Sequence, residues 1–323
     1  MDAPAPTRPI AFLFPGQGSQ SVGMGKDLAQ NFPLARDTFS QADAALDYPL
    51  TQLCFEGPEE KLKLTELTQP AILTASIAAC RVLQEHGIKP DYLAGHSLGE
   101  YSAHVVAGTF GFIDAVVTVR KRGKYMQEAV PVGVGAMAAV LGFPLTELRT
   151  VCEEAAQGEV VSPANINSTE QTVISGHKAA VERAVELAKQ RGAKRTVMLP
   201  VSAPFHCALM QPAQDLLAVD LEQLKLSSML FPVSANIDGK LRDSPDAARA
   251  ALVQQVTGAV EWVACIHTLI ARGVETFVEI GPGKVLCGLM RQIDRSKTCL
   301  NVEDVASLKK TLASLAPDSA PQS

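Results

Sequence analysis

The sequence predicts an α/β protein in which a large domain with a parallel sheet is interrupted by a smaller domain. Two features predict the large domain: continuous apolar runs typical of buried parallel strands, and a glycine-containing turn directly after the runs at 10–14, 91–94 and 276–280. Between residues 132 and 200 the strands and helices become short and closely spaced. We therefore expect a large domain from residues 1–131 and 201–323, and a small domain from 132–200.

The composition is typical of a globular protein without a membrane or nucleic-acid partner. The chain has 323 residues, a net charge of -5, 47% hydrophobic residues and a mean hydropathy of +0.11. The negative charge argues against nucleic acid or an anionic membrane as the main partner. The first apolar run is too short for a signal sequence or a membrane span, so we expect a cytoplasmic protein.

The cysteines predict neither a disulfide framework nor a metal site. They are odd in number, scattered, and contain no Cys-x-x-Cys pair. We expect reduced, mostly buried thiols at all seven positions: Cys54, Cys80, Cys152, Cys207, Cys265, Cys287 and Cys299.

The first strand, at 10–14, ends in Pro15-Gly16-Gln17-Gly18-Ser19-Gln20. Its glycines allow the backbone to approach a bound group at the carboxyl edge of the sheet, although an ordinary turn explains them equally well. The turn lacks the third glycine of a dinucleotide fingerprint and no Gly-Lys-Ser/Thr follows, so no nucleotide cofactor is expected. Amphipathic helices are predicted over 23–67 and an apolar helix over 69–84.

A possible nucleophile, Ser97, follows the apolar strand at 91–94. It lies in Gly95-His96-Ser97-Leu98-Gly99 and is followed by a predicted helix to about residue 107. In such a strand-to-helix turn the serine is strained and exposes its hydroxyl, and the glycines avoid steric conflict. A tight turn in which the serine only caps the helix is the alternative.

The segment 111–129 has helical spacing and carries a cluster of cations. Arg120, Lys121, Arg122 and Lys124 are typical of a solvated helix face, and the pattern favours that interpretation. An inward-pointing arginine could instead hold a substrate carboxylate with two parallel hydrogen bonds.

The small domain has the element order βαββαβ, which is the ferredoxin-like arrangement. Its predicted strands and helices, in order, are 136–141, 144–156, 160–166, 171–175, 177–191 and 194–199.

The chain then returns to the large domain through the loop 201–207, which contains His206. A histidine after the serine elbow in chain order suits a general base. His104, His177 and His267 fit structural positions better. A strand at 231–236, helices at 244–257 and 260–272, a strand at 276–280 and a helix from 284 complete the pattern, and the tail from Pro317 is expected to fray.

Five blocks, in this order, resemble the malonyl-CoA:acyl carrier protein transacylases of bacterial type II fatty-acid synthesis. They are Phe14-Pro15-Gly16-Gln17-Gly18-Ser19-Gln20, Gly95 to Ala103, Arg122-Gly123-Lys124-Tyr125-Met126-Gln127, Pro204-Phe205-His206-Cys207 and Glu279-Ile280-Gly281-Pro282-Gly283. The resemblance covers nearly the whole chain. It implies an α/β-hydrolase-like large domain with an inserted ferredoxin-like small domain.

The resemblance also implies a role for each site residue. Ser97 would be the nucleophile and His206 its base, oriented by a backbone carbonyl near Gln255. Gln17 and Leu98 would supply the backbone N–H groups of an oxyanion hole. Arg122 would hold the malonyl carboxylate, with Phe205 and His96 in the substrate pocket. Phe205 is placed to exclude a methyl branch, although ordinary packing explains it too.

The implied activity is transfer of malonyl from malonyl-CoA to the phosphopantetheine thiol of acyl carrier protein, by a monomer without a cofactor or metal. Basic residues near Arg122 and Arg191 could face the acidic carrier protein, although a merely solvated distribution explains them equally well; they are Lys121, Lys124, Arg191, Lys194 and Arg195. A serine thioesterase, a trans-acting acyltransferase of a polyketide or malonate-processing pathway, and a non-catalytic docking subunit are the alternatives.

Overall fold

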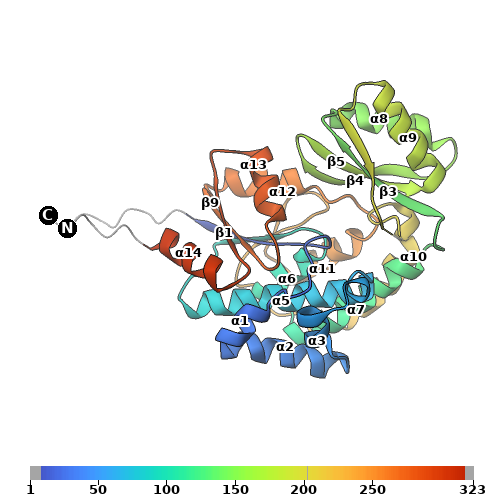
Figure 1. Cartoon of the computed structure of the whole chain (residues 1–323). Helices are drawn as coiled ribbons and strands as arrows, with labels where there is room; N and C mark the ends of the chain where they lie inside the picture. The colour runs from blue at the N-terminus through green and yellow to red at the C-terminus, as the bar shows by residue number, and fades with distance from the viewer. Residues whose placement is uncertain (1–8, 202, 317–323) are drawn as a thin grey trace.

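The structure, a computed structural model, describes residues 9–201 and 203–316. It consists of a six-stranded sheet with helices on both faces and a separate four-stranded sheet at one end of the molecule (Figure 1). The expected fraying from Pro317 lies outside the described residues. No helix in the described part of the chain is long and apolar enough to span a membrane. Nor do three or more His, Cys, Asp or Glu side chains there gather as a metal site would require.

The large sheet has the strand order β10-β9-β1-β2-β7-β8, and all neighbours are parallel except β7 and β8. The strands are β1 (Ile10–Phe14), β2 (Tyr92–Gly95), β7 (Val233–Ser234), β8 (Leu241–Arg242), β9 (Thr276–Ile280) and β10 (Thr298–Val302). Phe14 pairs with Gly95, so the turns after β1 and β2 lie side by side at the carboxyl edge. This edge is where open parallel sheets bind ligands.

Both faces of the central strand are buried, which explains its unbroken apolar sequence. Phe12 and Phe14 belong to the core shared with the amino-terminal helices, whereas Ala11 and Leu13 pack with Trp262 on the other face. The helices before the second strand are α1 (Lys26–Asn31), α2 (Pro33–Leu46), α3 (Leu50–Glu56), α4 (Glu59–Leu62) and α5 (Thr65–Glu85). Those that follow in the large domain are α6 (Gly99–Val106), α7 (Phe112–Glu128), η1 (Ala208–Met210), α10 (Gln211–Gln223), α11 (Pro245–Gln254), α12 (Trp262–Ala271), α13 (Val285–Ile293) and α14 (Val305–Leu315).

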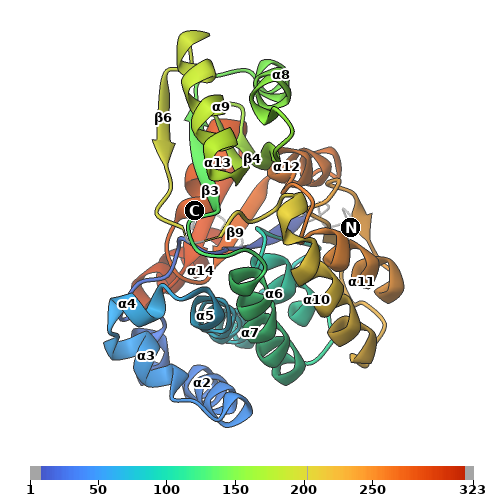
Figure 2. The ribbon, with the colours of Figure 1, turned by 90° about the vertical axis from the view of Figure 1, so that its right-hand side faces the viewer.

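The four-stranded sheet is antiparallel with the order β4-β5-β3-β6. Its elements are β3 (Gly135–Leu141), α8 (Leu145–Ala156), β4 (Val161–Ser168), β5 (Gln171–His177), α9 (Lys178–Gln190) and β6 (Arg195–Met198). Ala138 and Ile174 pack under α8 and α9, while Met137 and Val173 belong to the core of the large domain. Figure 2 shows this sheet opposite α2, α3 and α5. The predicted α/β fold class is confirmed, and the boundaries at 132 and 200 stay predictions.

Several elements differ from the sequence predictions. The strand expected over 231–236 shortens to β7, because Ala235 donates to the carbonyl of Lys240 and turns the chain into β8. The pattern did not predict α10, β8, β10 or α14. The expectation that all cysteines are reduced was wrong for Cys287 and Cys299, which form a disulfide with their Cα atoms 5.4 Å apart. The packing of α13 on β10 brings this pair together, and the other five cysteines are free and buried.

A buried carboxylate, Glu279, caps the amino terminus of α13. Its two oxygens accept the backbone N–H groups of Leu286 and Cys287 at 3.0 and 2.8 Å. We expect Glu279→Ala to lower the free energy of unfolding by about 2–4 kcal/mol, because both donors lose a buried acceptor. Denaturant unfolding at pH 7 measures this. Glu182→Ala, which removes an exposed partner of Lys178, should cost under about 0.5 kcal/mol, and equal losses for the two variants would contradict the capping role.

Candidate active site

Ser97 occupies the sharp turn between β2 and α6 in a left-handed backbone conformation, with φ of 50°. Such a conformation is strained for a residue with a side chain. The two glycines are required by close backbone contacts: a Cβ at Gly95 would lie 1.9 Å from the carbonyl carbon of Gly99, and one at Gly99 would lie 2.0 Å from the oxygen of Phe14. The glycines therefore allow the backbone segments to approach closely at this turn. The turn in its strained form exposes the Ser97 hydroxyl at the carboxyl edge of the sheet.

The turn is held by Asn236, a fully buried residue just beyond β7. Asn236 Oδ1 accepts the Ser97 N–H at 2.7 Å, and its Nδ2 donates to the Gly95 carbonyl at 2.7 Å. These bonds satisfy polar groups that the tight turn leaves without helix or sheet partners. Sequence reasoning missed Asn236. Its position at the carboxyl end of a parallel strand was the available signal.

The structure brings His206 to Ser97 across 109 residues of sequence. His206 Nε2 lies 2.7 Å from Ser97 Oγ, and Nδ1 lies 2.9 Å from the backbone carbonyl of Gln255. Because a carbonyl only accepts, Nδ1 carries the proton and Nε2 is free to accept one from the serine. The geometry is that of a nucleophile and its base, with a neutral carbonyl in the orienting place.

Burial lowers the pKa of His206 to about 3, and the positive charge of Arg122 adds to this effect. We therefore expect the acid limb of kcat/KM for Ser97 acylation to lie well below the ordinary histidine value, with little loss as the pH falls from 8 to about 5. Pre-steady-state acylation measured across this range tests it, with circular dichroism as the control for folding. A half-loss of rate near pH 6.5 would contradict it.

Arg122 is buried, with 1% of its surface exposed, so the solvated-face interpretation of the cation cluster was wrong for this residue. Its neighbours Lys121 and Lys124 have side chains 48% and 57% exposed. The helix α7 packs on α5, and this contact turns one position of the cluster inward. Helical spacing alone does not show which cation faces a neighbouring helix.

The hydrogen-bond partners of the Arg122 guanidinium are neutral oxygens, and the group lies 5.4 Å from the centroid of the Tyr101 ring. It donates to Gln69 Oε1 at 2.8 Å, to Gln255 Oε1 at 2.8 Å and to Ser97 Oγ at 3.1 Å. Among the described residues, no carboxylate forms an ion pair with it within 4.0 Å. The buried carboxyl of Glu100 acts on this charge electrostatically but is linked to it through the Gln255 amide, and a buried cation with no direct ion pair favours an anionic ligand. Arg122 is therefore placed to bind a negatively charged group beside the serine hydroxyl.

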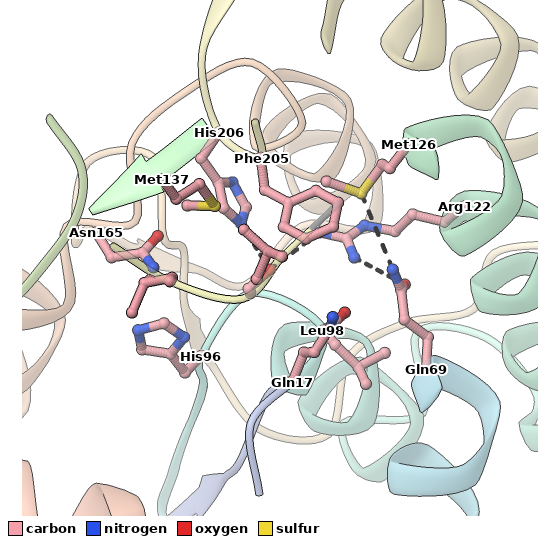
Figure 3. A pocket seen from close by; sticks show the side chains of 13 residues that line it. Gln17, Gln69, His96, Leu98, Arg122, Met126, Met137, Asn165, Phe205 and His206 are labelled. Atoms are coloured by element: carbon pink, nitrogen blue, oxygen red, sulfur yellow. Dashed lines mark hydrogen bonds between the residues drawn. The ribbon is translucent and has the colours of Figure 1, made fainter. Parts of the chain in front are cut away.

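These residues line a cavity of about 120 Å³ (Figure 3). Its lining is Gln17, Gln69, His96, Ser97, Leu98, Arg122, Met126, Met137, Asn165, Leu199, Val201, Phe205 and His206. The lining includes the seven residues, other than Gln255, to which the family resemblance assigned a role in the site: Gln17, His96, Ser97, Leu98, Arg122, Phe205 and His206. Gln255 lies behind Arg122 and His206. A second cavity of about 310 Å³ shares Gln17, His96, Asn165 and Leu199 with the first, so the two adjoin.

Gln17 and Leu98 lie at the turns after β1 and β2, and both line the cavity (Figure 3). Neither backbone N–H donates to an acceptor within residues 9–201 and 203–316. Two free donors at such turns can stabilise an oxyanion that forms on an attacked carbonyl. His96 Nε2 bonds to Asn167 Oδ1 at 2.8 Å and thereby joins the elbow to the small sheet.

Comparisons with known proteins agree with this geometry. Residues 11–318 match the family model described as acyl transferase domain. The chain is 51% identical to the malonyl CoA-acyl carrier protein transacylase of Escherichia coli K12 over 94% of this chain and 98% of that protein. The Bacillus subtilis protein of the same name is 47% identical over 95% of this chain and 97% of its own length.

Solved structures are equally similar. The malonyl CoA-acyl carrier protein transacylase of Coxiella burnetii superposes with a TM-score of 0.94 at 46% identity, covering 96% of this chain and 98% of that one. A malonyl-transacylase solved in complex with a type II PKS acyl-carrier protein has a TM-score of 0.93 at 48% identity, covering 95% and 99%.

Proposed function

The chain belongs to the acyl transferase domain family, and we propose that it transfers malonyl from malonyl-CoA to the phosphopantetheine thiol of acyl carrier protein, in fatty-acid biosynthesis. The observation that carries this proposal is the buried Arg122 guanidinium, which lies 3.1 Å from Ser97 Oγ and forms no direct ion pair within the described residues. An acyl group on Ser97 with a carboxylate at its far end would meet that cation. The relatives that share about half of its residues bear the corresponding name.

In the first half-reaction, Ser97 Oγ attacks the thioester carbonyl while His206 Nε2 takes the hydroxyl proton. The backbone N–H groups of Gln17 and Leu98 stabilise the oxyanion, each contributing about 10²–10³ in rate. The intermediate collapses as the C–S bond breaks, and His206 returns its proton to the CoA thiolate. A malonyl ester remains on Ser97, with its carboxylate held by Arg122.

The second half-reaction reverses these steps with a new thiol. His206 Nε2 takes the proton of the phosphopantetheine thiol as the sulfur attacks the ester carbonyl, and it gives that proton to Ser97 Oγ as the C–O bond breaks. The enzyme is regenerated and malonyl-carrier is released. Because CoA leaves before the carrier reacts, the kinetics are expected to be ping-pong.

The adjoining cavity suits the pantetheine arm that both thiols share. Its wall carries the amides of Asn165, Asn167 and Gln171, which can pair with the two amide groups of that arm. Phe205, 9% exposed at the wall of the catalytic cavity, is the side chain that we expect to meet a methyl branch on the malonyl group. One methyl is worth about 1–3 kcal/mol, so the expected preference for malonyl over methylmalonyl is modest.

The proposed reaction also bears on the cofactors and on the docking of the carrier protein. We expect a cytoplasmic monomer that needs no metal or cofactor, because the chemistry uses only a serine, a histidine and backbone donors. Of the basic residues considered for carrier docking, Lys121 pairs with Asp220, Arg191 with Glu154 and Lys194 with Glu170. These pairs reduce the local positive charge available for an acidic carrier.

The rival function is a serine thioesterase, in which water takes the acyl group. The neutral carbonyl of Gln255 behind His206, in place of a carboxylate, favours the transferase. The test follows malonyl-carrier formation and malonate release in parallel with holo-carrier protein, using apo-carrier as the control without a thiol. Transfer that requires the holo form supports the proposal. Rapid malonate release that is independent of the carrier would overturn it.

A further inference from the structure

Behind the serine elbow lies a buried carboxyl that the reaction steps above do not use. Glu100, the second residue of α6, has no exposed surface. Its Oε2 accepts the backbone N–H of Asn236 at 3.0 Å and the side-chain Nε2 of Gln255 at 2.7 Å. Burying a carboxyl lowers the free energy of unfolding unless its hydrogen bonds compensate for the loss of water. The contacts of Glu100 therefore indicate its role.

Gln255 connects this carboxyl to both reactive groups. Its Oε1 accepts from Arg122 at 2.8 Å, and its backbone carbonyl holds His206 Nδ1 at 2.9 Å. Its Nε2 donates to Ser97 O at 3.0 Å as well as to Glu100. One residue therefore contacts the base, the cation and the strained turn.

The Gln255 amide has only one orientation that satisfies its neighbours. If the amide were rotated by 180°, its NH2 group would face the NH2 of Arg122 and its oxygen would face Glu100 Oε2 and Ser97 O. Donor would then meet donor and acceptor would meet acceptor. Glu100 Oε2 makes the shortest of the bonds that exclude this rotated state.

We propose that Glu100 is a positioning residue: its Oε2 fixes the Gln255 amide so that Gln255 Oε1 holds the Arg122 guanidinium toward the acyl group on Ser97. The inference rests on the proposed function, in which Arg122 binds the acyl carboxylate. Only one carboxyl oxygen is needed for this role. Glu100 Oε1 forms no hydrogen bond within the described residues, and it lies 3.9 Å from Nε2 of His104, whose pKa burial lowers to about 3.

The two oxygens make Glu100→Gln a conservative variant. Its amide oxygen can replace Oε2 as acceptor, and its NH2 would face His104 Nε2, which also lacks a partner in the described residues. Glu100→Leu keeps similar volume but removes the acceptor. Glu100→Asp keeps the carboxyl and withdraws it from Gln255 by one methylene.

The readout is the ratio of Ser97 acylation rates with malonyl-CoA and acetyl-CoA, followed by intact mass on protein whose folding is checked by circular dichroism. For Glu100→Leu we expect this ratio to fall about 10- to 100-fold, because the carboxylate clamp is misplaced. For Glu100→Gln the ratio should stay within about 3-fold of the native value. A merely structural role would lower both rates together, and an unchanged ratio in Glu100→Leu would overturn the proposal.

A double-variant cycle tests whether Glu100 acts through Gln255. The effects of Glu100→Leu and Gln255→Leu on the ratio should not multiply, because each removes the same contact. Gln69→Leu is the matched control: Gln69 holds the other side of Arg122 and does not contact Glu100, so its effect should multiply with that of Glu100→Leu. Multiplication in both pairs would contradict the proposal.

Two further measurements test the role of Glu100 if Glu100→Leu does not fold or if the proposed function is wrong. If Glu100→Leu does not fold, Glu100→Asp takes its place, with the same fall in the ratio expected. If the native enzyme is not acylated by malonyl-CoA, the proposed function fails, and crystal structures of Glu100→Gln and Glu100→Asp decide the inference. It holds if Gln255 Oε1 remains on Arg122 in the first variant and not in the second, and it fails if the two are alike.

Discussion

Ser97→Ala is expected to abolish the malonyl-enzyme and to lower the rate of malonyl transfer by about 10⁴–10⁶-fold, because no other group in the cavity can form the ester. The hydroxyl lies 2.7 Å from His206 Nε2 in a turn that exposes it. Incubation with malonyl-CoA followed by acid quench and intact mass measures the adduct directly. His206→Ala should still bind the donor but form the adduct about 10²–10⁴-fold more slowly.

Ser102→Ala is the matched control for Ser97. Ser102 lies on α6, the helix that follows the Ser97 turn; it is fully buried, and its hydroxyl forms no hydrogen bond within the described residues. Its loss should leave acylation unchanged. Stoichiometric labelling of Ser97→Ala would show that another residue is the nucleophile.

Arg122→Ala is expected to lower kcat/KM for malonyl-CoA by about 10²–10³-fold and to leave acetyl-CoA much less affected. The native guanidinium is desolvated and held by neutral oxygens, so it forms a direct ion pair only when a substrate carboxylate enters the cavity. Removing one partner of such a buried charged pair costs about 3–4 kcal/mol for the charged donor, and an acetyl donor makes no such pair. Parallel progress curves with the two donors measure the change.

Arg122→Lys and Lys124→Ala complete this experiment. Lysine keeps the charge but lacks the planar fork, so it should recover only part of the malonyl preference. Lys124 lies on the same helix with its side chain 57% exposed and paired with Glu128, and its loss should leave the preference intact. An equal fall for both donors in Arg122→Ala would mean that Arg122 supports the fold and does not select the acid.

The parts of the site that were predicted from the sequence are those set by neighbouring residues. Gly95-His96-Ser97-Leu98-Gly99 after an apolar run predicts the elbow, because the crowding at Gly95 arises within the turn itself, although Gly99 meets the backbone of Phe14 on the neighbouring strand. The βαββαβ order could likewise be read from local periodicity. Short polar strands such as β8 and the mixed β10 carry no such period, and they were missed.

The positions of Arg122, Gln255 and Glu100 could not be worked out in that way. Spacing placed Arg122 with solvated cations, and only the resemblance to a family moved it into the site. Nothing in the sequence next to Glu100 or Asn236 shows that they meet, because 136 residues separate them. The disulfide between Cys287 and Cys299 joins residues 12 apart, and it was missed because it depends on how α13 packs against β10.

The sequence by itself therefore determined the α/β class, the serine elbow and the order of the small domain, since these depend on local sterics and on the period of apolar residues. The tertiary structure alone decided which cation is buried, which carbonyl orients His206, and which side chains hold the Gln255 amide. Those contacts join segments that are distant along the chain. Their geometry is set by how helices and sheets pack, and local propensity does not encode it.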